Sequence, residues 1–481
     1  MKSIAKIFFL ILIGIHVLAI AGWAANTVEI DAQNRVILNG QPFFPLGLYV
    51  IEPTSDSSYA TELDEIADSP FDTVMNYAIN AYGGTNATNE EIATYLDELQ
   101  ERDLKVVFSL KEYFSTCDSN NVCNNPGPLS SASADIITNK VGTFKDHDAV
   151  IAWYTNDESC PDCLEQLEDG YDLIKSLDID HVIWSAHWNT NWLLQEAYTT
   201  DIVGVDCYPV PDYPITWVSG MADHAMEAGK PLWFVLQLFD WWDKRPPTKD
   251  EMRAMTYLAT NHGAKGLIYY SYFDISSDTD YQERWDAIRD IAGEIDQLKG
   301  VFLSTDQTNG EDITCDSPDI DFKLMKKDGT YYLFAVNTAV DTQGLPVPVT
   351  DVSFQVNLTH VPAKFSVLFE GRQVDVDGGI FIDDFPGDYA VHVYEADSDG
   401  DGLSDSQDDD DDNDGMTDLW EAGYPGLNPF SNDADSDLDN DRYTNYEEFL
   451  SATEPDLDTS RPLEVVEVIP HDGAGIDSDT T

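Results

Sequence analysis

The sequence predicts a multidomain protein in which a (β/α)8 TIM barrel is followed by an all-β sandwich and then by an acidic, loop-rich tail. Between residues 43 and 273, eight short apolar runs alternate with amphipathic stretches at intervals of about thirty residues. After residue 300, apolar and polar residues alternate, with turn signals between the runs. From Asp397 onward, acidic residues dominate and recur at alternate positions.

The first residues predict export. Lys2 and Lys6 precede an apolar run over residues 7–20, and small residues follow at Ala21 and Ala24. This is the pattern of a secretory signal peptide over residues 1–24, and the run is too short for a stable membrane span. A retained amphiphilic anchor is the alternative. No later segment is apolar for long enough to cross a bilayer, so we expect a secreted, extracellular or cell-surface protein.

The charge balance excludes several classes of partner. The chain has 90 Asp and Glu residues against 25 Lys and Arg, which gives a formal charge of −65 at pH 7. A field of this sign repels nucleic acid and anionic lipid, and it makes contact with polyanionic substrates costly. It suits divalent cations or neutral partners such as sugars, and we expect no nucleic-acid partner.

The eight apolar runs predict the parallel strands of a barrel domain over residues 25–300. Nearly continuous hydrophobicity implies strands that are covered on both faces, as in a parallel sheet. Eight strands alternating with helices match a (β/α)8 barrel in number and size. A doubly wound open sheet is the alternative, but no glycine-rich phosphate loop follows the first strand. The predicted strands are residues 43–50, 71–79, 105–110, 149–155, 181–186, 201–208, 231–239 and 265–273.

Two of the intervening helices have clear local signals. One covers residues 89–103 and has an apolar stripe on one face. The other begins at Thr248, which forms a capping box with Glu251, and ends at residues 261–263, "NHG". The stripe of the first helix comprises Ile92, Tyr95, Leu96 and Leu99.

Residues 301–396 predict a small antiparallel β-sandwich. Stretches such as "FKLMKKDGTYYLFAVNT" and "YAVHVYEA" alternate apolar and polar residues, and "KDG" and "DGG" mark the turns. We expect this accessory domain to pack on its neighbour. Sugar binding is the alternative, although no aromatic platform can be identified from the sequence.

In the acidic tail over residues 397–460, the acidic residues follow a regular spacing that a disordered segment would not require. In "DDDNDGMTDLWE", acids fall at loop positions one, three, five, nine and twelve, and Gly415 falls at position six. Calcium loops need this order: oxygen ligands, a glycine for the sharp turn, and a final bidentate carboxylate. Two further stretches share the frame, although Arg442 replaces the glycine in the third. The predicted Ca²⁺ ligands are Asp397, Asp399, Asp401, Asp405 and Asp408 in the first loop, Asp410, Asp412, Asp414, Asp418 and Glu421 in the second, and Asp437, Asp439, Asp441, Asn445 and Glu448 in the third.

The tail resembles thrombospondin type 3 repeats, with some likeness to dockerin loops. The resemblance implies structural Ca²⁺ and a calcium-stiffened spacer, or a stalk that attaches the protein to a cell surface or matrix. A solvated, disordered segment is the alternative. Residues 461–481 are predicted to be a linker or the start of a truncated further domain.

Six cysteines are compatible with disulfides in an exported chain. Cys117 and Cys123 enclose a short polar loop and are predicted partners, and "CPDC" at residues 160–163 predicts a second local staple. Cys207 and Cys315 either pair with each other or stay reduced.

In a barrel, side chains at the carboxyl ends of the strands meet at one mouth. Here they combine carboxylates with Trp and Tyr, as a sugar site requires, because aromatic faces stack on sugar C–H groups and a carboxylic acid protonates a departing oxygen. We expect catalytic carboxyl groups at Glu158 and Asp206. The predicted substrate-binding residues are Asn76, His187, Trp188, Tyr208, Gln237 and Tyr272.

Residues 28–295 also resemble a family. "VILNGQPFFPLGLYV", "WYTNDE", "DIVGVDCYPVP" and "KPLWFVLQLF" are similar to clan A glycoside hydrolases, the β-galactosidase-like barrels. The resemblance implies that Glu158 is the general acid/base at the end of strand four. Asp157 stands where that clan usually has Asn, and its negative charge would favour the protonated form of Glu158.

The clan nucleophile is a Glu at the end of strand seven, and the matching residue here is Gln237. Three explanations remain open. Another rim carboxylate, Asp206 or less plausibly Asp240 or Asp274, acts as base or nucleophile; the substrate supplies its own nucleophile; or the barrel only binds carbohydrate. The sequence predicts a secreted glycosidase that hydrolyses O-glycosidic bonds of a neutral poly- or oligosaccharide, with no cofactor in the barrel. The alternative is a non-catalytic carbohydrate-binding or cell-surface protein.

Overall fold

The computed structural model describes residues 26–50, 59–77, 79, 87–241, 244–276 and 278–463. The predicted signal peptide and residues 464–481 of the predicted C-terminal segment lie outside the described residues. Within them, no helix combines the length and the apolar composition that crossing a bilayer requires.

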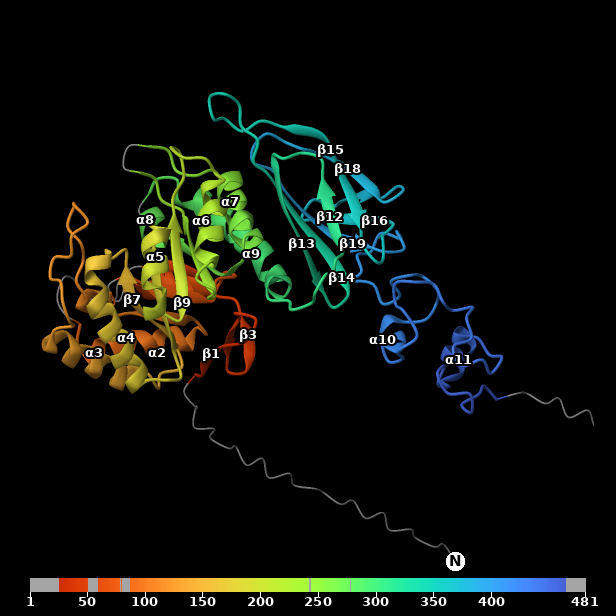
Figure 1. Cartoon of the computed structure of the whole chain (residues 1–481), viewed down its shortest axis with the longest axis horizontal. Helices are drawn as coiled ribbons and strands as arrows, with labels where there is room; N and C mark the ends of the chain where they lie inside the picture. The colour runs from red at the N-terminus through yellow and green to blue at the C-terminus, as the bar shows by residue number, and fades with distance from the viewer. Residues whose placement is uncertain are drawn as a thin grey trace, which may run out of the picture. The chain divides into compact units, whose positions relative to one another are not determined.

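Eight parallel strands close into a barrel (Figure 1). Closure joins the last strand to the first, where Leu267, Ile268 and Tyr269 pair with Leu46, Gly47 and Leu48, so the open-sheet alternative is excluded. Each of the eight predicted apolar runs overlaps one barrel strand, and the predicted (β/α)8 barrel is confirmed. The strands are β4 (Leu46–Val50), β5 (Thr73–Asn76), β6 (Lys105–Ser109), β7 (Val150–Asp157), β8 (Val182–His187), β9 (Ile202–Cys207), β10 (Leu232–Gln237) and β11 (Ala264–Tyr270).

Helices alternate with these strands along the chain. The capping box that the sequence predicts at Thr248 and Glu251 is formed at α7, and α2 has an equivalent box at Thr88 and Glu91. All four residues of the predicted apolar stripe of α2 are buried. The helices are α1 (Tyr59–Ala67), α2 (Asn89–Glu101), α3 (Ser131–Phe144), α4 (Leu164–Leu177), α5 (Thr190–Glu196), α6 (Trp217–Met226), α7 (Lys249–Asn261), α8 (Tyr272–Ile275) and α9 (Tyr281–Phe302), with 3₁₀ turns η2 (Lys111–Tyr113), η3 (Pro161–Cys163) and η4 (Ala197–Thr199).

A small antiparallel sheet precedes the barrel. Its strands are β1 (Val28–Ile30), β2 (Val36–Leu38) and β3 (Gln41–Phe43). The apolar pattern predicts that the first barrel strand begins at residue 43, but β3 ends there and β4 begins at Leu46. Pro45 separates the two strands, which explains why one apolar run contains the end of one strand and the whole of another.

The predicted β-sandwich is confirmed as two antiparallel sheets. One has the order β12–β15–β18 and the other β13–β14–β19–β16–β17. Alternate side chains of both sheets form one core around Phe354, Phe365, Phe381 and Tyr394. The strands are β12 (Asp312–Cys315), β13 (Ile320–Lys327), β14 (Thr330–Asn337), β15 (Val349–Asn357), β16 (Lys364–Leu368), β17 (Arg372–Asp375), β18 (Ile380–Phe385) and β19 (Val391–Asp397).

The chain groups into two compact units. The first contains the chain up to Asp206 with His224–Val235 and Lys265–Tyr281; the second contains Cys207–Asp223, Leu236–Ala264 and the chain from Gln282 onward. Within the second unit, α7 and α9 pack on the sandwich, since the rings of Tyr257 and Phe302 lie 6.1 Å and 5.1 Å from that of Phe334. The acidic tail in this unit carries two short helices, α10 (Asp418–Glu421) and α11 (Asn445–Ser451).

Candidate active site

Glu158 lies directly after β7, where the chain leaves the barrel sheet. Its φ is +59°, a left-handed conformation that is uncommon for a residue other than glycine. Its N–H donates to the carbonyl of Ala186 at 3.0 Å, and the next N–H, of Ser159, donates to Oδ1 of Asn156 at 2.9 Å. These bonds fix the turn on both sides of Glu158, whose side chain is exposed.

Asp157, the last residue of β7, receives three donors. The hydroxyls of Tyr154 and Tyr77 donate to its oxygens at 2.7 Å and 2.5 Å, and Nζ of Lys111 lies 2.8 Å from Oδ2. The same ammonium lies 3.0 Å from the centroid of the Tyr77 ring. Asp157 is therefore held in a fixed orientation beside Glu158 by a residue of β7 and by residues that follow β5 and β6.

Asp206, on β9, is 6% exposed, and its carboxyl group is hydrogen-bonded to that of Glu158. Burial raises the pKa of Asp206 well above its usual value, and the hydrogen bond to Glu158 and repulsion from Glu158 and Asp157 add to this effect. The structure thus brings the two predicted catalytic carboxyl groups together, within hydrogen-bonding reach of each other.

Aromatic rings surround this acidic cluster. The ring centroids of Tyr49, Tyr77 and Tyr270 lie 4.9 to 6.3 Å apart in pairs. Burial, followed by repulsion from Asp274 and from the three acids of the cluster, raises the pKa of Tyr270 to about 12. Tyr77 and Tyr270 are partly exposed, so aromatic surface adjoins Glu158.

Most of the other predicted binding residues in the first unit are turned into the protein. Asn76 is fully buried. His187 is buried, with Nε2 2.8 Å from the carbonyl of Ser159 and 3.2 Å from Oε2 of Glu196. The hydroxyl of buried Tyr272 donates to Glu65 at 2.7 Å. Trp188, by contrast, is 45% exposed.

In the second unit, Gln237 is fully buried and bonded to the backbone. Its Oε1 accepts the N–H of Val210 at 2.9 Å, and its Nε2 donates to the carbonyls of Val210 and Phe239 at 2.9 and 3.1 Å. Tyr208 packs its ring 5.0 Å from that of Phe239. The amide at the position of the clan nucleophile is therefore a structural link between two segments of the chain.

Sequence reasoning missed four groups around Glu158. Tyr49 is the last residue but one of the first barrel strand and Tyr270 ends the last, so the rule that strand ends meet at the mouth points to both of them. Tyr154 lies inside β7, and nothing in its spacing shows that its hydroxyl reaches Asp157. Glu196 lies on α5, and only the fold brings it to His187.

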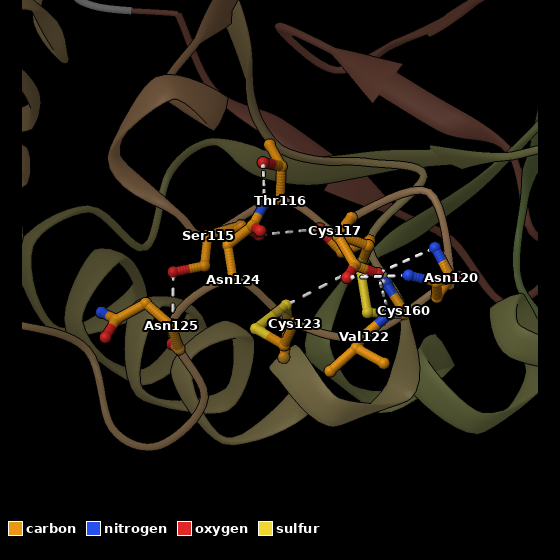
Figure 2. The surroundings of a disulfide bond; sticks show 12 residues. Ser115, Thr116, Cys117, Asn120, Val122, Cys123, Asn124, Asn125 and Cys160 are labelled. Atoms are coloured by element: carbon orange, nitrogen blue, oxygen red, sulfur yellow. Dashed lines mark hydrogen bonds between the residues drawn. A yellow bond between two sulfur atoms is a disulfide. The ribbon is translucent and has the colours of Figure 1, made fainter.

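The predicted disulfide pairing is wrong. Cys117 is joined to Cys160, and Cys123 to Cys163 (Figure 2). Cysteines that are close in the sequence do not pair, because the 117–123 loop lies against the segment that follows Glu158 and each of its cysteines meets one of "CPDC". Among the described residues, no disulfide joins Cys207 and Cys315. Two covalent links therefore fasten the chain shortly beyond Glu158, at Cys160 and at Cys163.

No protein-family model matches the chain, and a search of curated proteins found no match. Among solved structures, it is similar to a glycoside hydrolase family 5 protein from Bacteroides vulgatus ATCC 8482, at 13% identity and a TM-score of 0.51, over 79% of this chain and 94% of that one. A second structure, described as a glycoside hydrolase, is 12% identical with a TM-score of 0.52, over 78% and 98% of the two chains. The α-amylase of Geobacillus thermoleovorans, complexed with acarbose, is 11% identical with a TM-score of 0.50, over 73% and 98%. The barrel fold is shared with these glycoside hydrolases. The β-galactosidase-like subtype stays a prediction.

The three tail loops bring their first acids together. The carboxylates at positions one, three and five lie within 4.8 Å of one another in each loop, namely Asp397, Asp399 and Asp401, Asp410, Asp412 and Asp414, and Asp437, Asp439 and Asp441. At position six, Gly402 and Gly415 have φ of +114° and +92°, and Arg442 has a φ of +91°, so the third loop keeps the turn without glycine.

The residue at position nine has the same role in all three loops. A side-chain oxygen of Asp405, Asp418 or Asn445 accepts the N–H of the second residue of its loop at 2.7, 2.9 and 3.2 Å, respectively. These side chains therefore close the loop. Asp408, at position twelve of the first loop, accepts the N–H of Asp410 at 3.1 Å.

Glu421 and Glu448, at position twelve of the second and third loops, have no exposed surface. Within the described part of the chain, neither oxygen of Glu421 and only one oxygen of Glu448 has a hydrogen-bond partner. Burial, followed by repulsion between neighbouring acids, raises the pKa of Glu421 to about 8 and that of Glu448 to about 7. Oxygen-only groups of this kind fit a hard cation such as Ca²⁺.

Proposed function

We propose that the chain is a secreted glycoside hydrolase that cleaves O-glycosidic bonds of a neutral oligo- or polysaccharide, with Glu158 as the proton donor. The observation that supports this best is the contact between exposed Glu158 and buried Asp206. A pair of carboxyl groups in contact binds one proton more tightly than either group would alone. Glu158 is the member of the pair that a sugar can reach.

The proposed chemistry uses that proton. Glu158 gives it to the glycosidic oxygen, the bond from that oxygen to the anomeric carbon breaks, and its electron pair stays on the departing sugar's oxygen. Positive charge then develops on the remaining sugar ring, and the nearby Asp157 stabilises it electrostatically. Asp206 acts through Glu158 as a positioning residue that keeps the proton available. Because Gln237 cannot act as a nucleophile, the attacking oxygen comes from water or from the substrate itself.

Three features support a neutral sugar as substrate. The partly exposed rings of Tyr77 and Tyr270 offer faces on which sugar C–H groups stack. The formal charge of −65 disfavours polyanions. The barrel fold is also shared with two solved glycoside hydrolases.

The test is the release of reducing ends from a panel of neutral glycans by the wild-type protein and by Glu158→Gln. We expect Glu158→Gln to lose roughly 10²- to 10⁴-fold in turnover, the usual contribution of a general acid. Asp162→Asn, which removes an exposed acid four residues further on, is the matched control and should retain activity. If both the wild-type protein and Glu158→Gln bind a glycan equally and neither turns it over, the chain is instead the non-catalytic carbohydrate-binding protein.

We further propose that the acidic tail binds structural Ca²⁺ and acts as a stiffened spacer or attachment stalk. The position-one, -three and -five acids of each loop would hold the ion, with Glu421 and Glu448 completing the second and third loops. Circular dichroism and proteolysis of the tail, with calcium and with chelator, test this. We expect calcium to protect the tail from cleavage, and equal cleavage in both conditions would contradict the proposal.

A further inference from the structure

We infer that Asp433, which lies outside all three loop motifs, is an additional ligand for the cation of the second loop and joins the second and third loops into one cooperative calcium-binding unit. The inference rests on the proposed calcium binding of the tail. Below, the second loop is Asp410–Glu421 and the third is Asp437–Glu448.

Asp433 completes a group of three carboxylates with Asp414 and Glu421. One oxygen from each lies within 4.8 Å of the others. Glu421 is fully buried, and both of its oxygens are without a hydrogen-bond partner among the described residues. A buried carboxylate in this state needs a compensating positive charge, and a cation shared by the three groups would supply it.

The backbone around Asp433 is already tied to the second loop. Oδ2 of Asp414 accepts the N–H groups of Asp433 and Ala434 at 3.1 and 3.0 Å. Because these bonds hold the segment in place, the Asp433 carboxylate is preorganised beside Glu421. Repulsion from Asp414 and Asp433 contributes to the raised pKa of Glu421, after burial.

Asp433 is also hydrogen-bonded to the third loop. Nδ2 of Asn445, at position nine of that loop, donates to the carbonyl of Asp433 at 2.8 Å and to its Oδ1 at 3.3 Å. Oδ1 of Asn445 accepts the N–H of Leu438 within the third loop. Asp433 therefore lies between the proposed cation of one loop and the residue that closes the other.

Apolar packing makes the two loops a single body. The ring of Trp420 on α10 lies 5.1 Å from that of Phe449 on α11. Gly415 lies so close to Tyr446 that a Cβ added there would be 2.9 Å from the ring. Ordering the second loop therefore presents a surface on which the third loop packs.

The first loop is attached elsewhere. Asp397 is the last residue of β19, and one of its oxygens accepts a hydrogen bond from Gln373 of β17 at 2.7 Å. Nζ of Lys364 on β16 donates to the carbonyl of Gly400 in the same loop at 2.8 Å. The first loop is thus fastened to the sandwich edge, whereas Asp433 links the second and third loops.

Calorimetric titration of the chelator-stripped full chain with CaCl₂ tests the inference. We expect Asp433→Asn to weaken the second-loop site about tenfold or more, a usual size for a coupled ligand, and to weaken the third-loop site as well. Because coupling is reciprocal, Glu448→Gln in the third loop should also weaken the second-loop site. Asp435→Asn, an exposed acid two residues from Asp433, is the matched control and should titrate like the wild type.

Two outcomes would overturn the inference. One is an Asp433→Asn titration that matches that of the wild type; the other is a second-loop affinity that Glu448→Gln leaves unchanged. These two outcomes can be distinguished from failure of the proposed calcium binding by the tail. In that case the wild-type chain itself would bind no calcium. Proteolytic protection of the tail, measured on the same variants, gives a readout that does not depend on glycosidase activity.

Discussion

Gln237 and Val210 are joined by two hydrogen bonds of 2.9 Å, one in each direction. Only an amide satisfies both, since its oxygen accepts the N–H of Val210 while its nitrogen donates to the carbonyl of the same residue. A Glu at this position would leave that buried carbonyl without its donor and would bury a charge. The side chain is therefore selected by the backbone around it.

From this geometry we expect Gln237→Glu to create no nucleophile. The change should lower the free energy of unfolding by about 1–3 kcal/mol, the usual cost of an unsatisfied buried polar group, and should not raise turnover. Urea denaturation and glycan hydrolysis measure the two effects. Gln195→Glu, at an exposed position on α5, is the control and should leave stability nearly unchanged. A gain in hydrolysis by Gln237→Glu would show that the structural link is not the reason for the amide.

Replacing Asp206 should change how stability depends on pH. Burial, followed by contact with Glu158, raises the pKa of Asp206, so the folded chain binds this proton more tightly than the unfolded chain does. In an unfolded chain the pKa of Asp is about 3.9. The contribution of protonated Asp206 to stability is therefore present below that pH, and it is lost as the pH rises towards the raised pKa of the folded chain. We expect Asp206→Asn to unfold at a higher temperature than wild type at pH 8 and at nearly the same temperature at pH 4.

The activity of Asp206→Asn separates function from packing. As a positioning residue for Glu158, Asp206 should lower kcat and leave KM nearly unchanged when it is replaced, because it contacts Glu158 and is itself buried. An unchanged kcat, together with the expected gain in stability, would make Asp206 a purely structural group.

His262 should stabilise the second unit in a pH-dependent way. Burial by itself lowers the pKa of His262, but hydrogen bonds of 2.8 Å to Asp321 and 2.7 Å to Asp223 outweigh burial and raise the pKa to about 9. The ordinary value is 6.5, so the stabilisation is fully present below pH 6.5 and is lost as pH rises through about 9. We expect His262→Gln to cost about 1–2 kcal/mol at pH 6, a figure reduced for the solvent exposure of Asp223.

Denaturant unfolding of wild type and His262→Gln between pH 6 and pH 10 measures this effect. The difference between the two proteins should shrink towards pH 10. His147→Gln is the control, because this ring lies 3.3 Å from a single exposed acid, Asp97. A difference for His262→Gln that stays constant across this range would mean that packing, and not charge, is lost.

The two disulfides should differ in their effect on catalysis. They close loops of similar length, with sequence separations of 43 and 40 residues, so removing either should cost about 2–4 kcal/mol of stability. Cys160 is two residues from Glu158, whereas Cys163 begins the next helical segment. We therefore expect the Cys117→Ser/Cys160→Ser double variant to lose more kcat than Cys123→Ser/Cys163→Ser at equal folded fraction. Equal kcat in the two variants would contradict a positioning role for the first disulfide.

Local pattern was sufficient for most of the fold. Each barrel strand was predictable because a strand buried on both faces is apolar over nearly its whole length, as β10 is from Leu232 to Leu236. The capping box at Thr248 and Glu251 acts over three residues, so the start of α7 was readable as well. The register of the tail loops follows from fixed spacing in the same way.

The candidate site was only partly predictable, because position at a strand end does not give the direction of a side chain. The strand-end rule correctly brought Glu158 and Asp206 to one mouth, but it did not show that the two would touch. It also selected Asn76, His187 and Tyr272, whose side chains turn into buried networks. The direction of each side chain depends on its rotamer and on the residues packed around it, and sequence spacing specifies neither.

The sequence by itself determined the order of barrel, sandwich and acidic tail, because periodicity and composition act over a few residues and survive without knowledge of the fold. Only the tertiary structure decided which cysteines pair, how strongly the proton on Asp206 is held, and that Asp433 belongs with Glu421. Those properties depend on distances and burial between residues that the chain brings together only when it folds.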